Sequence, residues 1–189
     1  MVKGMANALD TLPADITALA IHKDLDGVIT AGRITRPMFV TVKEGEAYMA
    51  TTPLAYPDEI KNQNIIELPL TSVSQISPSG VKITDEKFEN VRVEDITFSV
   101  AKKAYDRMEA YLLNRKDSPR DLGDFGIYEC WRDMWHEPFV DCKYAKEGGL
   151  LKPYAAVLYN TLWAFYKEGR LHTVIDESNN KKVMKFWIE

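Results

Sequence analysis

The stretch VITAGRITRPMFVTVKEGEAYMATTPLAY, residues 28–56, decides how the first half of this chain folds. Its composition predicts three short strands separated by turn residues, over residues 28–34, 37–43 and 47–52. An Arg-x-x-Arg-Pro corner, with Arg33, Arg36 and Pro37, joins the first two strands. Pro37 opens a strand, where its missing N–H does little harm, and Gly45 lies in a hairpin turn. These short connections favour an antiparallel sheet.

The flanking residues extend this pattern to a strand-rich block over residues 14–84. Residues 5–13 predict a short helix that ends at Pro13, because proline cannot continue the hydrogen-bonded turns. Residues 16–22 are apolar at nearly every position, which predicts a strand buried on both faces. A turn ending at Gly27 follows. Further short strands are expected in the segments IIELPL, SVSQIS and VKIT, with a short helical turn or loop before them.

The character of the sequence changes near residue 98, where a segment with helical periodicity begins. An amphipathic helix is expected here, with one apolar face made of Phe98, Ala101, Tyr105, Met108 and Leu112. Residues 127–137 are aromatic-rich and predict a second helix. Residues 150–169 predict the clearest helix, ended by Gly169 at its C-cap. RLHTVID and KKVMKFWIE predict a terminal hairpin, so the order of elements is winged-helix-like.

Composition and charge exclude several classes of protein. Apolar residues make up 46% and charged residues 28% of 189 residues, which is a globular balance. The net charge of −4 disfavours a chain-wide footprint for a phosphate backbone. Two cysteines indicate a reducing compartment, so we expect a cytoplasmic protein. No apolar run approaches the roughly 20 residues that cross a bilayer, and no membrane association is expected.

Residues about 6–84 resemble the second half of a class II glutamine amidotransferase domain. This is the N-terminal-nucleophile (Ntn) glutaminase domain of glutamine–fructose-6-phosphate aminotransferase, also called glucosamine-6-phosphate synthase, and its relatives. Five segments match that family in order and spacing: ALDTLPADITALAI, DGVITAGR, ITRPMFVTV, GEAYMATTPLAYP and LPLTSVSQISPSGVKI. The resemblance implies an α+β fold that contains the antiparallel half of an Ntn-hydrolase-like sandwich. Residues 85–189 match nothing in the family.

The departures from the family pattern bear on catalysis. The family's nucleophile is a cysteine at the mature N-terminus, whereas Met1 is followed here by Val2. The family's glutamine-binding and oxyanion elements lie upstream of the matched region, and its Ala-Ser-Asp strand end is Ala50-Thr51-Thr52 here. We therefore expect the scaffold half without the catalytic half, with no catalytic residue in this chain. Half a sandwich exposes strand edges and an apolar sheet face, which residues 85–189, another chain or a missing segment would cover.

Candidate ligand-binding residues are few. Arg33 and Arg36 flank the corner before Pro37 and are the candidates for contact with a phosphate or carboxylate of a substrate, although strand-end arginines more often serve structure. Cys130, His136 and Cys142 follow a C-x5-H-x5-C pattern, which lacks the close pairs and fourth ligand of a zinc site. A Cys–His nucleophile is disfavoured as well, because residues six apart on a helix point in different directions. No metal or cofactor is expected.

Two features of the second half leave alternatives open. The aromatic cluster favours core packing over a ligand pocket or an interface; it comprises Trp131, Trp135, Phe139, Tyr154, Tyr159, Trp163, Phe165, Tyr166 and Trp187. The tail hairpin carries five basic residues: Arg170, His172, Lys181, Lys182 and Lys185. Nucleic-acid binding is disfavoured, because acidic residues dilute this patch and the preceding helix has almost no polar face.

These observations predict two modules. Residues 1–95 are an amidotransferase-like partial domain, and residues 96–189 are a helical, winged-helix-like module that ends in a hairpin. The chain is expected to be a fragment or subunit of a glucosamine-6-phosphate-synthase-like amidotransferase that does not hydrolyse glutamine alone. Its expected partner is a complementary amidotransferase half or a second copy of itself. The alternative is a non-enzymatic regulatory module that binds a protein or nucleic acid through its aromatic second half.

Overall fold

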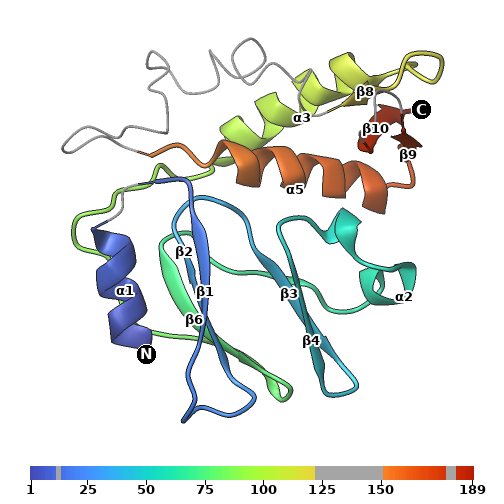
Figure 1. Ribbon diagram of the computed structural model, residues 1–189. Coiled ribbons are helices and arrows are strands. Elements are labelled where there is room, and N and C mark those ends of the chain that lie inside the picture. The colour runs from blue at the N-terminus through green and yellow to red at the C-terminus, as the bar shows by residue number, and fades with distance from the viewer. Residues whose placement is uncertain (12–13, 122–150, 178–181) are drawn as a thin grey trace. The chain divides into compact units, whose positions relative to one another are not determined.

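The structure is a computed structural model that describes residues 1–11, 14–121, 151–177 and 182–189 (Figure 1). The chain divides into two compact units, of which unit 1 comprises Met1–Asp95 and Val140–Tyr159, and unit 2 comprises Ile96–Phe139 and Asn160–Glu189. Unit 1 takes up residues 151–159, which the sequence had placed in the second module. The strands pair antiparallel in every sheet, so the predicted α+β class is confirmed. No helix in the described part of the chain is long and apolar enough to cross a membrane.

The first sheet of unit 1 has four strands in the order β1-β2-β6-β7. They are β1 (Thr17–Ile21), β2 (Ile29–Arg33), β6 (Ser72–Ser77) and β7 (Gly80–Ile83). β2 is buried on both faces, since Thr30 to Arg33 are all buried. The prediction that residues 16–22 are buried on both faces was wrong. β1 is an edge strand, and Leu19 and Ile21 are 50% and 80% exposed.

The second sheet of unit 1 has three strands in the order β4-β3-β5. They are β3 (Phe39–Lys43), β4 (Glu46–Ala50) and β5 (Ile66–Glu67). The hairpin between β3 and β4 turns through Glu44 and Gly45, which both have positive φ (53° and 82°), as a type I′ turn requires. The short helices η1 (Pro53–Ala55) and α2 (Asp58–Lys61) fill the predicted helical turn before β5.

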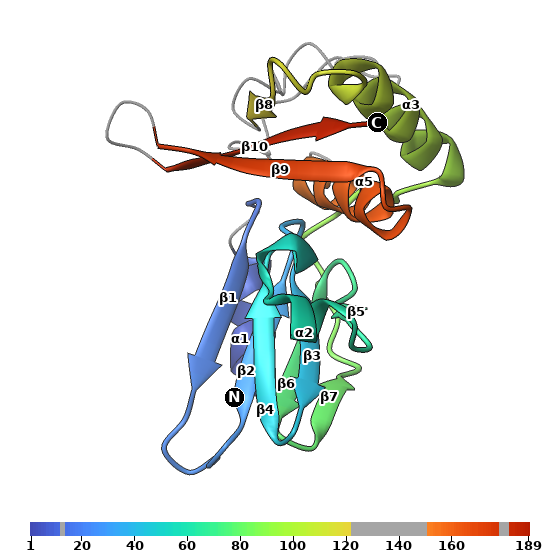
Figure 2. The ribbon, with the colours of Figure 1, turned by 90° about the vertical axis from the view of Figure 1, so that its right-hand side faces the viewer.

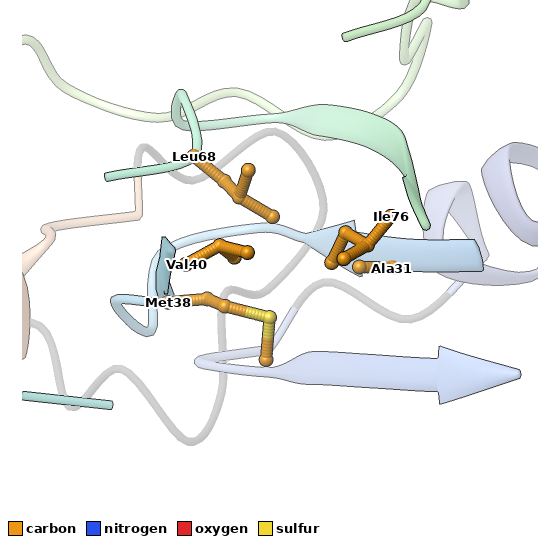
Figure 3. Packing of buried hydrophobic residues seen from close by; sticks show 5 residues of the cluster. All are labelled: Ala31, Met38, Val40, Leu68 and Ile76. Carbon is orange, nitrogen blue, oxygen red and sulfur yellow. The ribbon is translucent and has the colours of Figure 1, made fainter. Parts of the chain in front are cut away.

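The two sheets share one apolar core. Ala31 of β2 and Ile76 of β6 meet Val40 of β3, together with Met38 and Leu68 beside the second sheet (Figure 3). All five side chains are at most 6% exposed. Burial of this size stabilises each large aliphatic side chain by about 1.5–3 kcal/mol, so this cluster holds the sheets together.

Helices lie on the outer faces of both sheets of unit 1. Helix α1 (Val2–Asp10) packs on β2 and β6, and its Leu9 joins Ile34 and Val91 in a second cluster. Phe39, Tyr56 and Ile60 form a third cluster on the outer face of the second sheet, beside α2. Figure 1 shows the order from left to right: α1, the sheet with β1, β2 and β6, the sheet with β3 and β4, and α2. Unit 1 therefore has four layers.

Unit 2 contains a three-stranded sheet in the order β8-β10-β9 (Figure 2). Its elements are α3 (Phe98–Leu112), β8 (Arg120–Asp121), the end of α5 (Tyr154–Lys167), β9 (Leu171–Asp176) and β10 (Val183–Ile188). The predicted C-cap is confirmed, because Gly169 has φ +73° and its N–H donates to Tyr166 O. The predicted face of α3 was partly wrong. Val100 and Ala104 join Met108 and Leu112 on the buried stripe, whereas Phe98 is 84% exposed at the first turn.

The approach of α1 to β2 depends on Gly32. A Cβ at this position would lie 2.4 Å from Leu9 Cδ1 and 2.8 Å from Met5 Cγ. We expect Gly32→Ala to lower the free energy of unfolding by about 1–3 kcal/mol, because α1 must shift or its side chains must leave their rotamers. Gly4→Ala is the matched control within α1, where nothing lies within 4 Å. It should stabilise the helix slightly.

Urea unfolding of both variants tests this prediction. The double variant Gly32→Ala/Leu9→Ala should lose less than the sum of the two single losses, since removing the Leu9 methyl groups opens the space that the new methyl group at position 32 needs. Strict additivity, or a Gly32→Ala variant as stable as the parent chain, would contradict the close approach.

Tyr56 makes the stability of unit 1 sensitive to alkaline pH. Its hydroxyl donates to Phe39 O at 2.6 Å, and burial raises the pKa of Tyr56 from 10.0 to about 12. Below pH 10 both the folded and unfolded chains keep this proton. Between pH 10 and about 12 the unfolded chain loses it first, so stability should fall as the pH rises.

The Tyr56→Phe variant isolates this effect. It should be less stable than the parent chain at neutral pH, because it lacks the hydrogen bond to Phe39 O. The difference between the two chains in urea unfolding should shrink above pH 10, where only the parent chain carries the tyrosine. A difference that stays constant across this range would contradict the raised pKa.

Candidate functional site

The chain crosses between the two sheets of unit 1 twice, and the crossings lie side by side. Residues 34–38 carry the chain from β2 to β3, and residues 68–71 carry it back from β5 to β6. Leu68 N–H donates to Met38 O at 2.9 Å, and Thr71 N–H donates to Ile34 O at 3.2 Å. The predicted arginine corner is the first of these crossings.

Arg33 is the last residue of β2 and is buried, with 1% of its surface exposed. Its Nη2 pairs with Glu67 Oε1 at 2.8 Å, and its Nη1 donates to Leu68 O. Burial lowers the pKa of Arg33, while the charges of Glu67 and Asp15 oppose this shift. The guanidinium of Arg33, beside the first crossing, thus binds the carboxylate of Glu67 and the backbone carbonyl of Leu68, beside and in the second crossing.

Arg36 lies in the same corner but has a different partner. Its Nη2 donates to Asp15 Oδ2 at 2.7 Å, and Thr35 Oγ1 donates to the other oxygen of the same carboxylate at 2.7 Å. Thr17 Oγ1 donates to the backbone carbonyl of Arg36 at 2.8 Å. The side chain of Arg36 remains 46% exposed. It fastens the corner to the segment before β1 and still reaches solvent.

The two arginines therefore do not form a paired fork. Each guanidinium has its own carboxylate, and only that of Arg36 can offer donors to a dissolved anion without breaking the fold. If an arginine as deeply buried as Arg33 turned outward, its buried ion pair with Glu67 would break. Substrate binding by Arg33 and Arg36 stays a prediction, and their geometry favours a structural role for Arg33.

The cysteine-based candidates lie outside the described residues, since Cys130, His136 and Cys142 all fall within 122–150. The described ranges contain no cysteine and no group of three or more His, Cys, Asp or Glu side chains placed to hold a metal ion. His22 lies near Asp24 (3.7 Å) at an exposed turn after β1. The expectations about metal and nucleophile stay predictions.

The basic residues of the tail hairpin have acidic neighbours. Lys182 pairs with Glu177 at 2.7 Å, and Lys185 pairs with Asp176 at 2.6 Å. His172 stacks on Trp187, with ring centroids 5.2 Å apart, and lies 3.6 Å from Glu189. Lys181 lies outside the described residues. Phosphates would have to displace these carboxylates, which weighs against a nucleic-acid surface.

Arg170 is the centre of a network that the sequence did not predict. It donates to Glu109 Oε1 at 2.5 Å, to the Tyr105 hydroxyl at 2.9 Å and to the Glu189 carbonyl at 3.1 Å. Tyr105 donates in turn to Glu168 at 2.6 Å, and burial followed by this bond raises the pKa of Tyr105. Arg170 thus joins α3 to the end of α5 and to the residue that follows β10. Sequence placed it in a solvent-facing patch, because pairs more than sixty positions apart leave no local pattern.

The described aromatic residues of the second half mostly pack internally. Phe165 is fully buried and contacts Tyr105, with ring centroids 4.6 Å apart. Trp163 stacks on Tyr166 at 4.9 Å, and both are partly buried. Trp131, Trp135 and Phe139 lie outside the described residues. Core packing accounts for Phe165, and the two stacked rings are the more accessible part of the predicted cluster.

Exposed apolar side chains occur in both units. In unit 1 they lie mainly on edge strands, with Leu19 and Ile21 on β1 and Ile83 on β7. In unit 2 they lie at Phe98 and Leu113, at the two ends of α3, and on the hairpin at Val174, Ile175 and Met184. The most exposed are Ile21 at 80% in unit 1 and Phe98 at 84% in unit 2. The exposed fraction therefore does not single out one unit as the unpartnered surface.

Substitution of the two arginines of this corner should lower the free energy of unfolding by different amounts. Arg33→Met should lower the free energy of unfolding by about 3–5 kcal/mol, because it removes the buried ion pair with Glu67 and the hydrogen bond to the Leu68 carbonyl. Arg36→Met is the matched control and should cost about 1 kcal/mol or less, since its ion pair is half-exposed. Urea unfolding midpoints measure both. Equal losses for the two variants would contradict the assignment of Arg33 as the buried link.

The chain was compared with protein-family models, with curated proteins and with solved structures. None of the three comparisons gives a match. The function proposed below therefore rests on the sequence resemblance and on the geometry of the two units.

Proposed function

We propose that unit 1 is the non-catalytic scaffold part of a glucosamine-6-phosphate-synthase-like glutamine amidotransferase. In this proposal a second polypeptide supplies the nucleophile, and the assembly releases ammonia from glutamine for transfer to a sugar phosphate. The chain alone does not hydrolyse glutamine. The observation that carries the proposal is the layer order of unit 1.

The layers of unit 1 support this proposal. An outer helix, two antiparallel sheets with a shared apolar core, and a second outer helical layer follow one another in unit 1. The five segments that resemble the amidotransferase family fall on α1 with β1, on β2, on β3, on β4 with η1, and on β6 with β7. Each matched segment therefore contains all or most of at least one strand of the two sheets of unit 1.

The catalytic part of the proposal rests on residue chemistry. Class II amidotransferases use a cysteine thiolate, and none of the residues described in unit 1 is a cysteine. In the arginine corner, Glu67 and the Leu68 carbonyl hold the guanidinium of Arg33, and Asp15 pairs with that of Arg36. Both observations favour a scaffold over an active site.

Unit 2 supports a second candidate function, which is docking of a protein partner. Its described elements follow the order α3, β8, α5, β9, β10, with the sheet order β8-β10-β9, and this order supports the winged-helix-like interpretation. The described lysines of its hairpin, Lys182 and Lys185, are paired with carboxylates, whereas Val174, Ile175 and Met184 are exposed. This combination favours an apolar protein contact over nucleic acid.

Glutamate release from glutamine by the purified chain tests the proposal. We expect no release above the rate without protein, and release once the complementary polypeptide from the native host is added. A double Cys130→Ser/Cys142→Ser variant is the control, because it removes both thiols of this chain. It should support the reconstituted activity as well as the parent chain does.

Two results would overturn this function. One is hydrolysis by the pure chain that the double cysteine variant lacks, which would place the nucleophile in this chain. The other is purification from the native host with nucleic acid or with proteins that confer no glutaminase activity. That result would favour the docking function of unit 2.

A further inference from the structure

We propose that two copies of this chain associate through β1. The β1 strands of the two copies pair antiparallel across a twofold axis, so that their four-stranded sheets form one continuous sheet. The inference is independent of the proposed function, since it rests only on the geometry of one edge strand. β1 lies at the edge of its sheet, and β2 is its one neighbour among the described strands.

The hydrogen-bonding groups of β1 show which residues face outward. Ile34 N–H donates to Ile16 O at 3.0 Å, so residues 16 and 34 form a hydrogen-bonded pair of the β1–β2 ladder. Pairs alternate along an antiparallel ladder, so Ala18 and Ala20 also bond towards β2. The N–H and C=O groups of Thr17, Leu19 and Ile21 therefore point to the open edge.

The side chains of the same residues form an apolar surface. Leu19 lies opposite Ala31 and Ile21 lies opposite Ile29, so both point to the face that carries the core between the sheets. They are nevertheless 50% and 80% exposed. Unpaired backbone groups and exposed aliphatic side chains together make a strand that can accept another strand.

β1 differs from the other edge strands of unit 1 because it contains no charged residue. β7 contains Lys82, β4 contains Glu46, and β5 is two residues long and ends in Glu67. Charged residues on an edge strand oppose pairing with a copy of itself. β1 reads TALAI and has neither a charge nor a proline.

Charge complementarity also selects the register. With Leu19 on the twofold axis, Thr17 faces Ile21 of the second copy, and Asp15 faces Lys23 of the second copy. A shift by one pair in either direction places Asp15 opposite Ile21 or Lys23 opposite Thr17. Asp15 already accepts from Thr35 and Arg36, and a carboxylate has about four acceptor sites, so Lys23 can add a further donor.

Sedimentation equilibrium over a range of protein concentrations tests the association. The parent chain should form a dimer. Leu19→Lys should weaken that dimer by about tenfold or more, because two like charges then meet at the axis. Ile83→Lys is the matched control, because Ile83 is 48% exposed on the opposite edge strand of the same sheet, and it should leave the dimer unchanged. Circular dichroism checks that both variants fold, as expected for exposed positions.

A cysteine cross-link tests the register. In a Cys130→Ser/Cys142→Ser background, Leu19→Cys should give an oxidised dimer, whereas Ile83→Cys should stay monomeric. A parent chain that is monomeric at every concentration would overturn the proposal. So would a dimer that Leu19→Lys leaves intact. Association through β1 with a different polypeptide alone would also overturn it, while supporting the complementary partner of the proposed function.

Discussion

The buried pairing of Arg33 with Glu67 and the Leu68 carbonyl is the constraint on which unit 1 depends. Arg33 ends the central strand of one sheet, and Glu67 ends the short edge strand of the other. A charge buried to this degree stays in place only if its partners are fixed. The interaction therefore determines where the chain leaves the first sheet and where it returns.

The shared core follows from that constraint. With the two crossings held side by side, Met38 and Leu68 enter the space between the sheets together with Val40 from β3. Ala31, on the same face of β2 as Arg33, leaves room for these larger side chains. On the opposite face, Gly32 leaves room for Met5 and Leu9 of α1. Small residues on both faces of β2 thus let two layers approach one central strand.

Local patterns predicted most of the elements. Hairpin turns at Gly27 and Gly45, the C-cap at Gly169 and the strands over residues 28–52 have sequence signals that act over a few residues, and all are present. What the pattern could not give was the position of a strand within its sheet. The segment TALAI is as apolar as a central strand, yet it lies at an edge, because the neighbour of a strand is set by distant residues.

The same limit applies to the candidate site. Sequence located Arg33 and Arg36 at one corner but could not tell which would be buried, because the deciding partners are Glu67, thirty-four positions later, and Asp15, on the other side of β1. Arg170 illustrates the converse, since a residue placed in a basic surface patch proved to be the centre of an internal network.

An edge strand with a central strand's composition has a physical consequence. Among the described residues, only the inner half of the β1 backbone has strand partners, and the aliphatic side chains of Leu19 and Ile21 are largely exposed. Chains normally avoid this arrangement by placing a charge or proline on the edge, as β7 and β4 do with Lys82 and Glu46. β1 has no charged residue or proline, so its apolar sequence favours pairing of this edge with another strand. The apolar composition of residues 16–22, which suggested a buried strand, is then explained by assembly instead of by the fold of one chain.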